Sequence, residues 1–226
     1  MLNCKNLSTF RLVTLALIAL LGSHLASEPL WAQKKPATPS YAIIPLSEAA
    51  GLVYGINAPG EMVGRLSPSG LPEATHWSFN NQGGVITTTL DSTVTIGVAP
   101  GALVKLDSVA GGINDDGIIV GDLSDYATGR EGRPVVWMNA LAAPQVLSVP
   151  LPNPPAVRVV GGAFAVSNLP TGFTGLKAVV VGRYIEYFDN LIPSEAPTVT
   201  HVVAWGITTD DQFTGAFELG SAAGPA

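Results

Sequence analysis

Cysteine is almost absent from this sequence. The only one among 226 residues is Cys4, which precedes an apolar run near the N-terminus. The chain beyond that run therefore has no disulfide, no thiolate nucleophile and no cysteine metal ligand. About 190 residues follow the run, and a chain of that length can build a hydrophobic core without covalent cross-links.

Charged residues are also scarce, at 12% of the chain, and acidic residues outnumber basic ones by 17 to 11. The formal net charge is -6 at pH 7. An acidic surface with scattered lysine and arginine disfavours nucleic acid and anionic lipid as partners. The exposed surface must be made largely of threonine, serine, asparagine, glycine and proline, as in many exported β proteins.

The sequence also lacks a helical pattern, because no segment after residue 32 has apolar residues at a period of 3.6. What recurs is a short glycine-rich segment. It has the sequence GINDDGIIVG at residues 112–121 and GINAPGEMVG at residues 55–64, and a stretched third copy covers residues 166–182. The sequence therefore predicts an all-β repeat domain.

Each copy has the layout of a β-hairpin. Residues 58–61, Ala-Pro-Gly-Glu, suit a type II turn, because proline presets φ at the first central position and glycine accepts a positive φ at the second. Asp116-Gly117 is a strong hairpin signal for the same reason. Asn57 and Asn114 stand where a side-chain amide can bond to the turn backbone, and Asn168 is their predicted counterpart in the third copy.

A strand that carries a tryptophan follows each copy. Trp77, Trp137 and Trp205 mark the same place in each unit, and their size and register predict that they pack in the core. We predict a structural role for all of the recurring positions: Gly55, Asn57, Gly60, Gly64, Trp77, Gly112, Asn114, Gly117, Gly121, Trp137, Asn168, Gly182 and Trp205.

This pattern resembles the family of extracellular repeats called HAF, after a His-Ala-Phe triplet, whose units contain GIN, a turn, GQVVG, a loop, HAFLW and a return strand. GINAPGEMVG with THW and GINDDGIIVG with VVW are similar to it, and the third copy, with HVVAW, departs further. The resemblance covers residues 41–219. Of the triplet only His76 and His201 remain, and Ala-Phe follows neither. The family has no assigned reaction and no known catalytic residues, so the resemblance implies no chemistry.

Residues 1–32 have the layout of a secretion signal. Lys5 and Arg11 form a positive n-region, and residues 12–21 form an apolar h-region of about ten residues. That run is too short to span a bilayer comfortably, although an uncleaved N-terminal anchor is the alternative. We therefore expect a secreted protein, extracellular or periplasmic, with no membrane span after the signal is removed.

The remaining chain divides into a lead-in and a repeat domain. Residues 33–40 are polar and contain proline, which predicts a flexible segment. The β-repeat domain is predicted at 41–226, with units at about 47–104, 105–160 and 161–219.

Several segments outside the repeat copies also have predicted structures. They are a strand at 41–46, a hairpin of strands 85–90 and 93–98 about Asp91-Ser92, a polar connector at 122–133, a short strand before a proline cluster in 144–155, a loop insertion at 184–198, and a strand at 213–219.

Three units of about four strands each favour a β-propeller-like array. Propellers close with roughly four to eight blades, so three blades form an open or incomplete array, unless two chains assemble or the remaining strands build a fourth blade. A threefold closure, as in a β-trefoil or β-prism, is the alternative. The units are long for a trefoil, and strands buried on both faces fit radial blades, so we favour the propeller-like interpretation.

Six aspartates are candidate calcium ligands. They cluster around the second hairpin and in the third unit, at Asp115, Asp116, Asp122, Asp125, Asp210 and Asp211. Calcium needs six to eight oxygens that converge from a loop, and the signature of such a loop is absent. Solvated turns are the favoured interpretation.

Two histidines are candidate metal ligands. His76 and His201 lie on the predicted strands that carry Trp77 and Trp205, and a carboxylate such as Glu73 could complete a site. They are not at equivalent positions, because His76 directly precedes its tryptophan and His201 lies four residues before its own. We therefore predict neither a metal site nor a cofactor.

No catalytic residue is predicted, since the G-x-S-x-G turn of serine hydrolases is missing. The aromatic insertion at 184–198 is a better candidate for binding, because loops on a rigid scaffold accumulate binding residues. The predicted binding residues are Tyr184, Glu186, Tyr187 and Phe188.

The favoured function is that of an exported, non-enzymatic β-repeat domain for binding or for extracellular or envelope assembly. Its expected partner is a protein or a glycan, or a second copy that pairs through open blade edges. The alternative is a secreted carbohydrate-active or other hydrolytic propeller whose carboxylates converge in a pocket. Carboxylates dispersed on loops would favour the first, and a cluster in a cleft the second.

Overall fold

The computed structural model describes residues 43–95, 103–125, 130–150, 158–170, 175–188 and 198–223. The chain divides into two compact units, residues 1–44 and residues 45–226, and all elements named below belong to the second. The predicted signal and lead-in, residues 1–40, lie outside the described residues. None of the described residues forms a helix long and apolar enough to cross a membrane.

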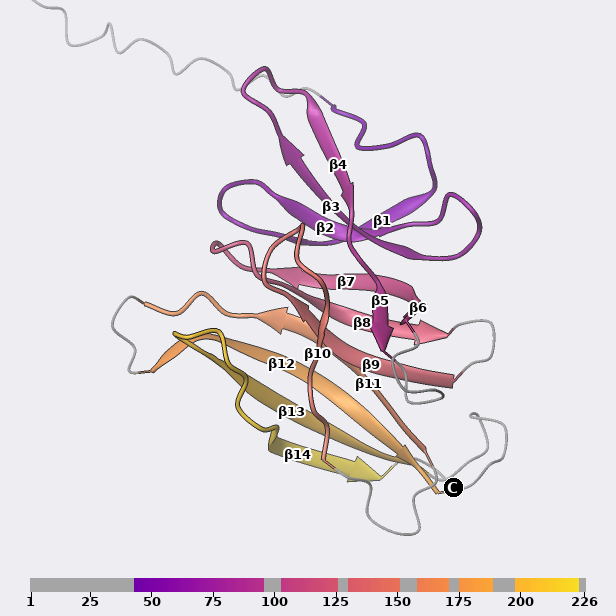
Figure 1. Cartoon of the computed structure of the whole chain (residues 1–226), viewed down its shortest axis with the longest axis vertical. Coiled ribbons are helices and arrows are strands. Elements are labelled where there is room, and N and C mark those ends of the chain that lie inside the picture. The colour runs from indigo at the N-terminus through magenta and orange to yellow at the C-terminus, as the bar shows by residue number, and fades with distance from the viewer. Residues whose placement is uncertain are drawn as a thin grey trace, which may run out of the picture. The chain divides into compact units, whose positions relative to one another are not determined.

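Three antiparallel sheets of four strands each carry the three repeat copies (Figure 1). The first sheet contains β1 (Gly51–Ile56), β2 (Met62–Leu66), β3 (Glu73–Phe79) and β4 (Val85–Thr89) in sequence order. The second contains β7 (Asp107–Ile113), β8 (Ile119–Asp125), β9 (Arg130–Trp137) and β10 (Gln145–Val146). The third contains β11 (Arg158–Val166), β12 (Leu176–Tyr187), β13 (Thr198–Thr208) and β14 (Phe217–Ala223). A separate ribbon pairs β5 (Thr93–Thr95) with β6 (Leu103–Lys105), and the prediction of an all-β chain is confirmed.

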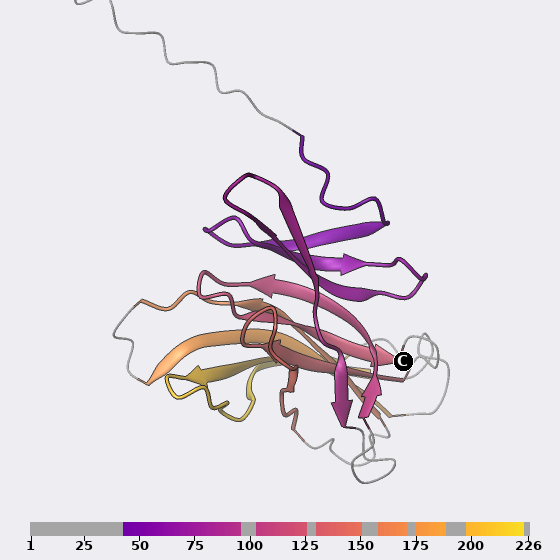
Figure 2. The ribbon, with the colours of Figure 1, turned by 45° about the horizontal axis from the view of Figure 1, so that its top comes forward.

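The three sheets follow one another as layers (Figures 1 and 2). The first strand of each later sheet packs on the sheet before it: β7 contacts β1, β2 and β3, and β11 contacts β7, β8 and β9. The core accordingly has two parts, one between the first and second sheets and one between the second and third. Each strand alternates its side chains between two faces, so the second sheet contributes to both parts.

The tryptophans lie in the core, as predicted. Trp137 belongs to the part between the first two sheets, and its Nε1–H donates to the carbonyl oxygen of Asp91 at 2.6 Å. Trp205 belongs to the other part and donates to the carbonyl oxygen of Ser148 at 2.7 Å. In both cases the acceptor lies just after the fourth strand of the preceding sheet. The indole thereby ties each sheet to its predecessor.

The glycine that closes each copy is required by a close approach of two strands. In each of the three four-stranded sheets, the first strand has a register shift opposite this glycine. A Cβ added at Gly64 or Gly121 would lie 1.9 Å from a carbonyl oxygen of the first strand, and one added at Gly182 would lie 2.3 Å from such an oxygen. No side chain fits there. Gly60 and Gly117, in the hairpin turns, have φ of 87° and 76°, a region that favours glycine.

Two predicted elements before the second repeat are wrong. Residues 43–50 contain no strand, although a strand was predicted at 41–46, and Pro45 in that segment has no N–H for a ladder. The hairpin predicted over residues 85–98 does not form either. β4 pairs with β3, Leu90 after it is buried in the core, and the chain then leaves the sheet so that β5 pairs with β6.

Two later boundaries also differ from the predictions. The polar connector at 122–133 is replaced over most of its length by strands, because buried Leu123 alternates with polar neighbours and continues β8 to Asp125. The last strand is β14, which starts at Phe217, while Phe213 forms an isolated bridge with Ile207. The short strand predicted within residues 144–155 is confirmed as β10.

Gly121→Ala should strongly destabilise the protein. The added methyl group would lie 1.9 Å from the carbonyl oxygen of Val109, and this obstacle is backbone, which cannot rotate away. We expect the free energy of unfolding, measured by urea denaturation, to fall by about 3 kcal/mol. Gly215→Ala is the control, because no atom lies within 4 Å of its added Cβ. Equal midpoints for the two variants would contradict the close-approach explanation.

Candidate functional site

A relay of side-chain hydrogen bonds connects the hairpin turns of the three sheets. Asn57 Nδ2 donates to the carbonyl oxygen of Asn114 at 3.0 Å, and Asn114 Nδ2 donates in the same way to the carbonyl oxygen of Ser167 at 3.0 Å. Asn57 and Asn114 are both buried. Buried amides of this kind are costly to leave unpaired, so the relay fixes the position of each turn relative to the next.

The same residues also close their own turns. Asn57 Oδ1 accepts from the backbone N–H of Glu61, Asn114 Oδ1 from that of Ile118, and Ser167 Oγ from that of Val179. The third member of the series is therefore Ser167, one residue before Asn168, which the sequence analysis placed there. The matching register shifts in β1, β7 and β11 show that Ser167 is the counterpart of Asn57 and Asn114. The sequence does not reveal this, because the third copy has a serine where the other two have asparagine.

Asp115 has a structural role in this relay. Its Oδ1 accepts from the backbone N–H of Ala58 at 2.7 Å, and its Oδ2 accepts from Asn168 Nδ2 at 2.9 Å. Asn168 Oδ1 in turn accepts from the backbone N–H of Asp115. The carboxylate is thus occupied by turn contacts, and among the described residues no group of three or more histidine, cysteine or acidic side chains is arranged to hold a metal ion.

An open groove of about 720 Å³ lies beside the first two turns, with Glu61, His76, Asp116 and Asn139 among its lining residues. His76 Nε2 is 3.6 Å from Glu61 Oε1, and Glu61 Oε2 accepts from Asn57 Nδ2 at 2.8 Å. The glutamate therefore links the histidine to the relay. His76 Nδ1 is buried and has no hydrogen-bond partner in the part of the chain that the structure describes, which is an uncommon state for a ring nitrogen.

The second histidine lies in a separate cluster on the third sheet. His201 Nδ1 is 2.9 Å from Glu218 Oε1, and its Nε2 is 3.4 Å from Glu186 Oε2. The Tyr184 ring stacks on the imidazole at a centroid distance of 4.3 Å and an interplanar angle of 10°. His76 and His201 thus lie on different sheets, each with its own glutamate, and they do not form one site.

The predicted binding residues lie largely inside the sheet. Residues 184–187 belong to β12 and not to a loop, because the alternation of Tyr184, Ile185 and Glu186 extends the strand against β13. Tyr184 and Glu186 are buried, and Tyr187 and Phe188 are half-buried. Residues 189–197 of the predicted loop lie outside the described residues.

Hydrogen bonding and burial shift two ionisations in this cluster. The hydrogen bond with His201 lowers the pKa of Glu218 below its ordinary value of 4.5. Burial, with the negative charges of Glu218 and Glu186, raises the pKa of Tyr184 above its ordinary value of 10.0. At neutral pH the cluster therefore holds an ionised Glu218 beside a neutral tyrosine.

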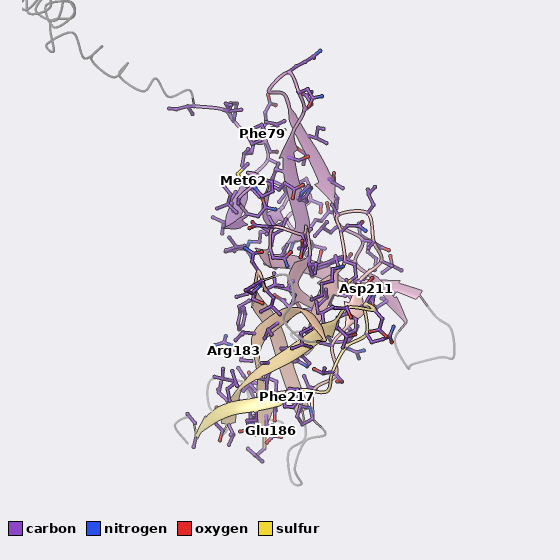
Figure 3. All side chains as sticks on the ribbon, turned by 90° about the vertical axis from the view of Figure 1, so that its left-hand side faces the viewer. Met62, Phe79, Arg183, Glu186, Asp211 and Phe217 are labelled. Carbon is purple, nitrogen blue, oxygen red and sulfur yellow. The ribbon has the colours of Figure 1, made fainter. Side chains whose placement is uncertain are left out.

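The outer face of the third sheet is apolar and exposed. We use this name for the face of β11 to β14 that points away from the second sheet. Its exposed side chains are Phe164, Val181, Val202, Phe217 and Leu219, and Arg183 Cζ lies 5.4 Å from the centre of the Phe164 ring. Figure 3 labels Phe217 and Arg183 on this sheet.

The register of the repeats shows that this face uses core positions. Val181 is the counterpart of Val63 and Val120, because each of them pairs with the residue that precedes a tryptophan. Val63 and Val120 are fully buried, because the next sheet covers them, whereas Val181 is 37% exposed. This face was not predicted from the sequence. The valine that precedes the closing glycine of each copy recurs in the sequence and was the signal that could have revealed it.

Comparison with protein-family models, curated proteins and solved structures finds no match to this chain. The resemblance to HAF repeats stays a prediction. The geometry itself defines a stack of β-sheets tied by turn contacts, with a buried histidine cluster and an exposed apolar face on the third sheet.

Asn114→Ala should destabilise the protein by about 2–4 kcal/mol. It leaves the N–H of Ile118 and the carbonyl oxygen of Ser167 without their partner in a buried setting. Asn80→Ala is the matched control, because Asn80 Oδ1 caps an exposed turn within one sheet. We expect the control to cost about 1 kcal/mol, measured by chemical denaturation. A similar loss in both variants would argue against the relay.

Glu218→Gln should lower the thermal midpoint at neutral pH, and the difference from wild type should disappear in acid. Because the folded pKa of Glu218 lies below its unfolded value, its ionisation stabilises the fold above about pH 4.5, and this contribution is lost as the pH falls through the folded pKa. Glu48→Gln changes the same charge on the exposed segment before β1 and should leave the profile unchanged. A difference that persists unchanged at pH 2 would contradict this origin.

Proposed function

We propose that this protein is an exported, non-enzymatic β-repeat module that acts by association, with the outer face of the third sheet as its partner surface. The observation that carries the proposal is the contrast between Val181, which is 37% exposed, and its buried counterparts Val63 and Val120. A position that is covered in two of three sheets is uncovered in the third. Proteins that remain monomeric seldom leave a contiguous apolar patch of this kind exposed.

The partner surface has the composition of an interface core. Phe217 is 61% exposed, and it lies with Val181 and Val202 on one face, since β13 pairs with β12 and β14 in register. Arg183, the cation of this patch, stacks over Phe164. Aromatic residues and arginine are the types that contribute most binding energy at protein interfaces, so the patch suits a protein partner.

A propeller-like arrangement of the sheets is the finer fold that we propose. The first strands of successive sheets lie side by side, because a Cβ added to Gly55 would lie 3.1 Å from Gly112 Cα and one added to Gly112 would lie 3.3 Å from Ala165 Cα. Adjacent first strands around a common axis are the arrangement of propeller blades. The sequence pattern of residues 1–32 supports export, and the HAF-like copies support an extracellular repeat.

A hydrolytic function finds less support. Glu186 and Glu218 approach the same imidazole from its two nitrogens, so the ring of His201 fills the space that a glycosidic bond would need between two carboxylates. The lowered pKa of Glu218 also opposes the role of a general acid, which needs a raised one.

Phe217→Asp should abolish self-association of the full chain. We expect the wild-type protein to exceed the mass of one chain in light scattering, and the variant, which places a charge within the patch, to associate at least tenfold more weakly. Leu141→Asp is the control, because Leu141 is also apolar and exposed but lies on a loop after β9. A wild-type protein that stays monomeric at every concentration, or a control that weakens association as much, would contradict the proposal.

A further inference from the structure

The outer face of the first sheet has no neighbouring sheet among the described residues. This face carries exposed Val53, Ile56 and Phe79 together with half-buried Met62 and buried Trp77, since the register of β1, β2 and β3 places them on one side. Ile56 is 67% exposed, whereas its counterpart Ile113 in the second sheet is 8% exposed because the first sheet covers it. Val53 is likewise exposed, and its counterparts Ala110 and Ala163 are buried.

The two outer faces are complementary, because they repeat the two halves of the contacts inside the chain. In each apolar core cluster, the face of one sheet that points along the chain packs on the face of the next sheet that carries its tryptophan. Among the described residues, no sheet packs on the outer face of the third sheet or on that of the first. Phe217 on the one face and Met62 with Phe79 on the other, labelled in Figure 3, therefore belong to the two halves of a contact already formed twice.

A buried hydrogen-bond donor gives a second and independent indication. Trp137 and Trp205 donate to a carbonyl oxygen of the preceding sheet, but Trp77 Nε1, on a side chain only 1% exposed, has no partner among the described residues. The position equivalent to the acceptors Asp91 and Ser148 is Ser221 in β14, because Gly220 pairs with Val202 as Leu90 and Leu147 pair with Ala74 and Pro134. A donor without an acceptor on one face corresponds to an acceptor position on the other.

We propose that the outer face of the third sheet docks onto the outer face of the first sheet of a second copy of this chain, head to tail. The inference rests on the proposed association function and names its partner. In this contact Val181 and Phe217 cover Val53 and Ile56, and the backbone carbonyl of Ser221 is the acceptor for Trp77, whose indole is buried in the single chain and becomes accessible on docking. The turn relay does not continue across the contact. Within the chain, Asp115 and Asn168 each offer a side-chain oxygen to the backbone N–H of the preceding turn, and the equivalent residue of the first sheet is Ala58, which has no such oxygen. The apolar faces therefore carry the contact.

Head-to-tail contacts close into a ring or continue into a filament. A ring of two chains contains six sheets, which falls within the range of about four to eight blades in closed propellers. Such a ring leaves no outer sheet face exposed. We therefore expect a two-chain species in solution.

Complementation of two blocked variants tests the orientation of the contact. Phe217→Asp blocks the outer face of the third sheet, and Ile56→Asp blocks that of the first. Both side chains are exposed, so each full-length variant should fold, which circular dichroism and the thermal midpoint would verify. Each variant alone should be monomeric in sedimentation velocity, and an equimolar mixture should form a 1:1 complex, because one intact contact remains between them.

The outcomes separate this inference from the proposed function. If the Ile56→Asp variant dimerises alone, the third sheets bind each other, so the head-to-tail inference fails and association through that face stands. If wild type associates and the folded mixture stays monomeric, the contact lies elsewhere, and both are wrong. If the mixture forms the 1:1 complex and neither variant self-associates, the head-to-tail contact is established.

Discussion

A β-sheet that is apolar on both faces needs a cover on each of them, and this constraint organises the whole molecule. The second sheet meets it within the chain, since Ile119 and Leu123 are buried against the first sheet while Val120 and Val136 are buried against the third. The burial of such side chains is the main favourable term in folding. For each of the two outer sheets, the described residues place a neighbouring sheet on one side only.

Position within the stack depends on polar contacts more than on apolar ones. Apolar faces slide with little penalty, whereas the relay from Asn57 through Asn114 to Ser167 fixes one turn against the next by directional hydrogen bonds. The indole N–H groups of Trp137 and Trp205 form a second set of directional bonds, to carbonyl oxygens just after the fourth strand of the preceding sheet. Within each sheet, the first strand comes so close to the second at its register shift that glycine is required at Gly64, Gly121 and Gly182. The repeated residues of the sequence are thus those that set the spacing of the strands and the position of the sheets.

The sequence was informative where one residue type satisfies a geometric demand. Glycine with positive φ at Gly60 and Gly117, the turn asparagines and the core tryptophans were all predicted from such demands. The alignment of the third copy was not, because a serine hydroxyl at Ser167 replaces the amide, and only the strand register locates it. The burial of Tyr184 and the pairing of His201 with Glu186 depend on contacts between strands distant in sequence. The uncovered faces required knowledge of which side of each sheet has a neighbour.

The central claim is that the outer face of the third sheet is buried in the associated protein. Hydrogen–deuterium exchange at low and high protein concentration tests it most directly, with β8 and β9 as the internal reference because they are covered on both sides. Every residue of β14 is exposed in the single chain. Those of its amides that do not donate to β13 should exchange quickly in dilute solution and become protected as the concentration rises, while β8 and β9 stay unchanged. Equal exchange of β14 at all concentrations would contradict the claim.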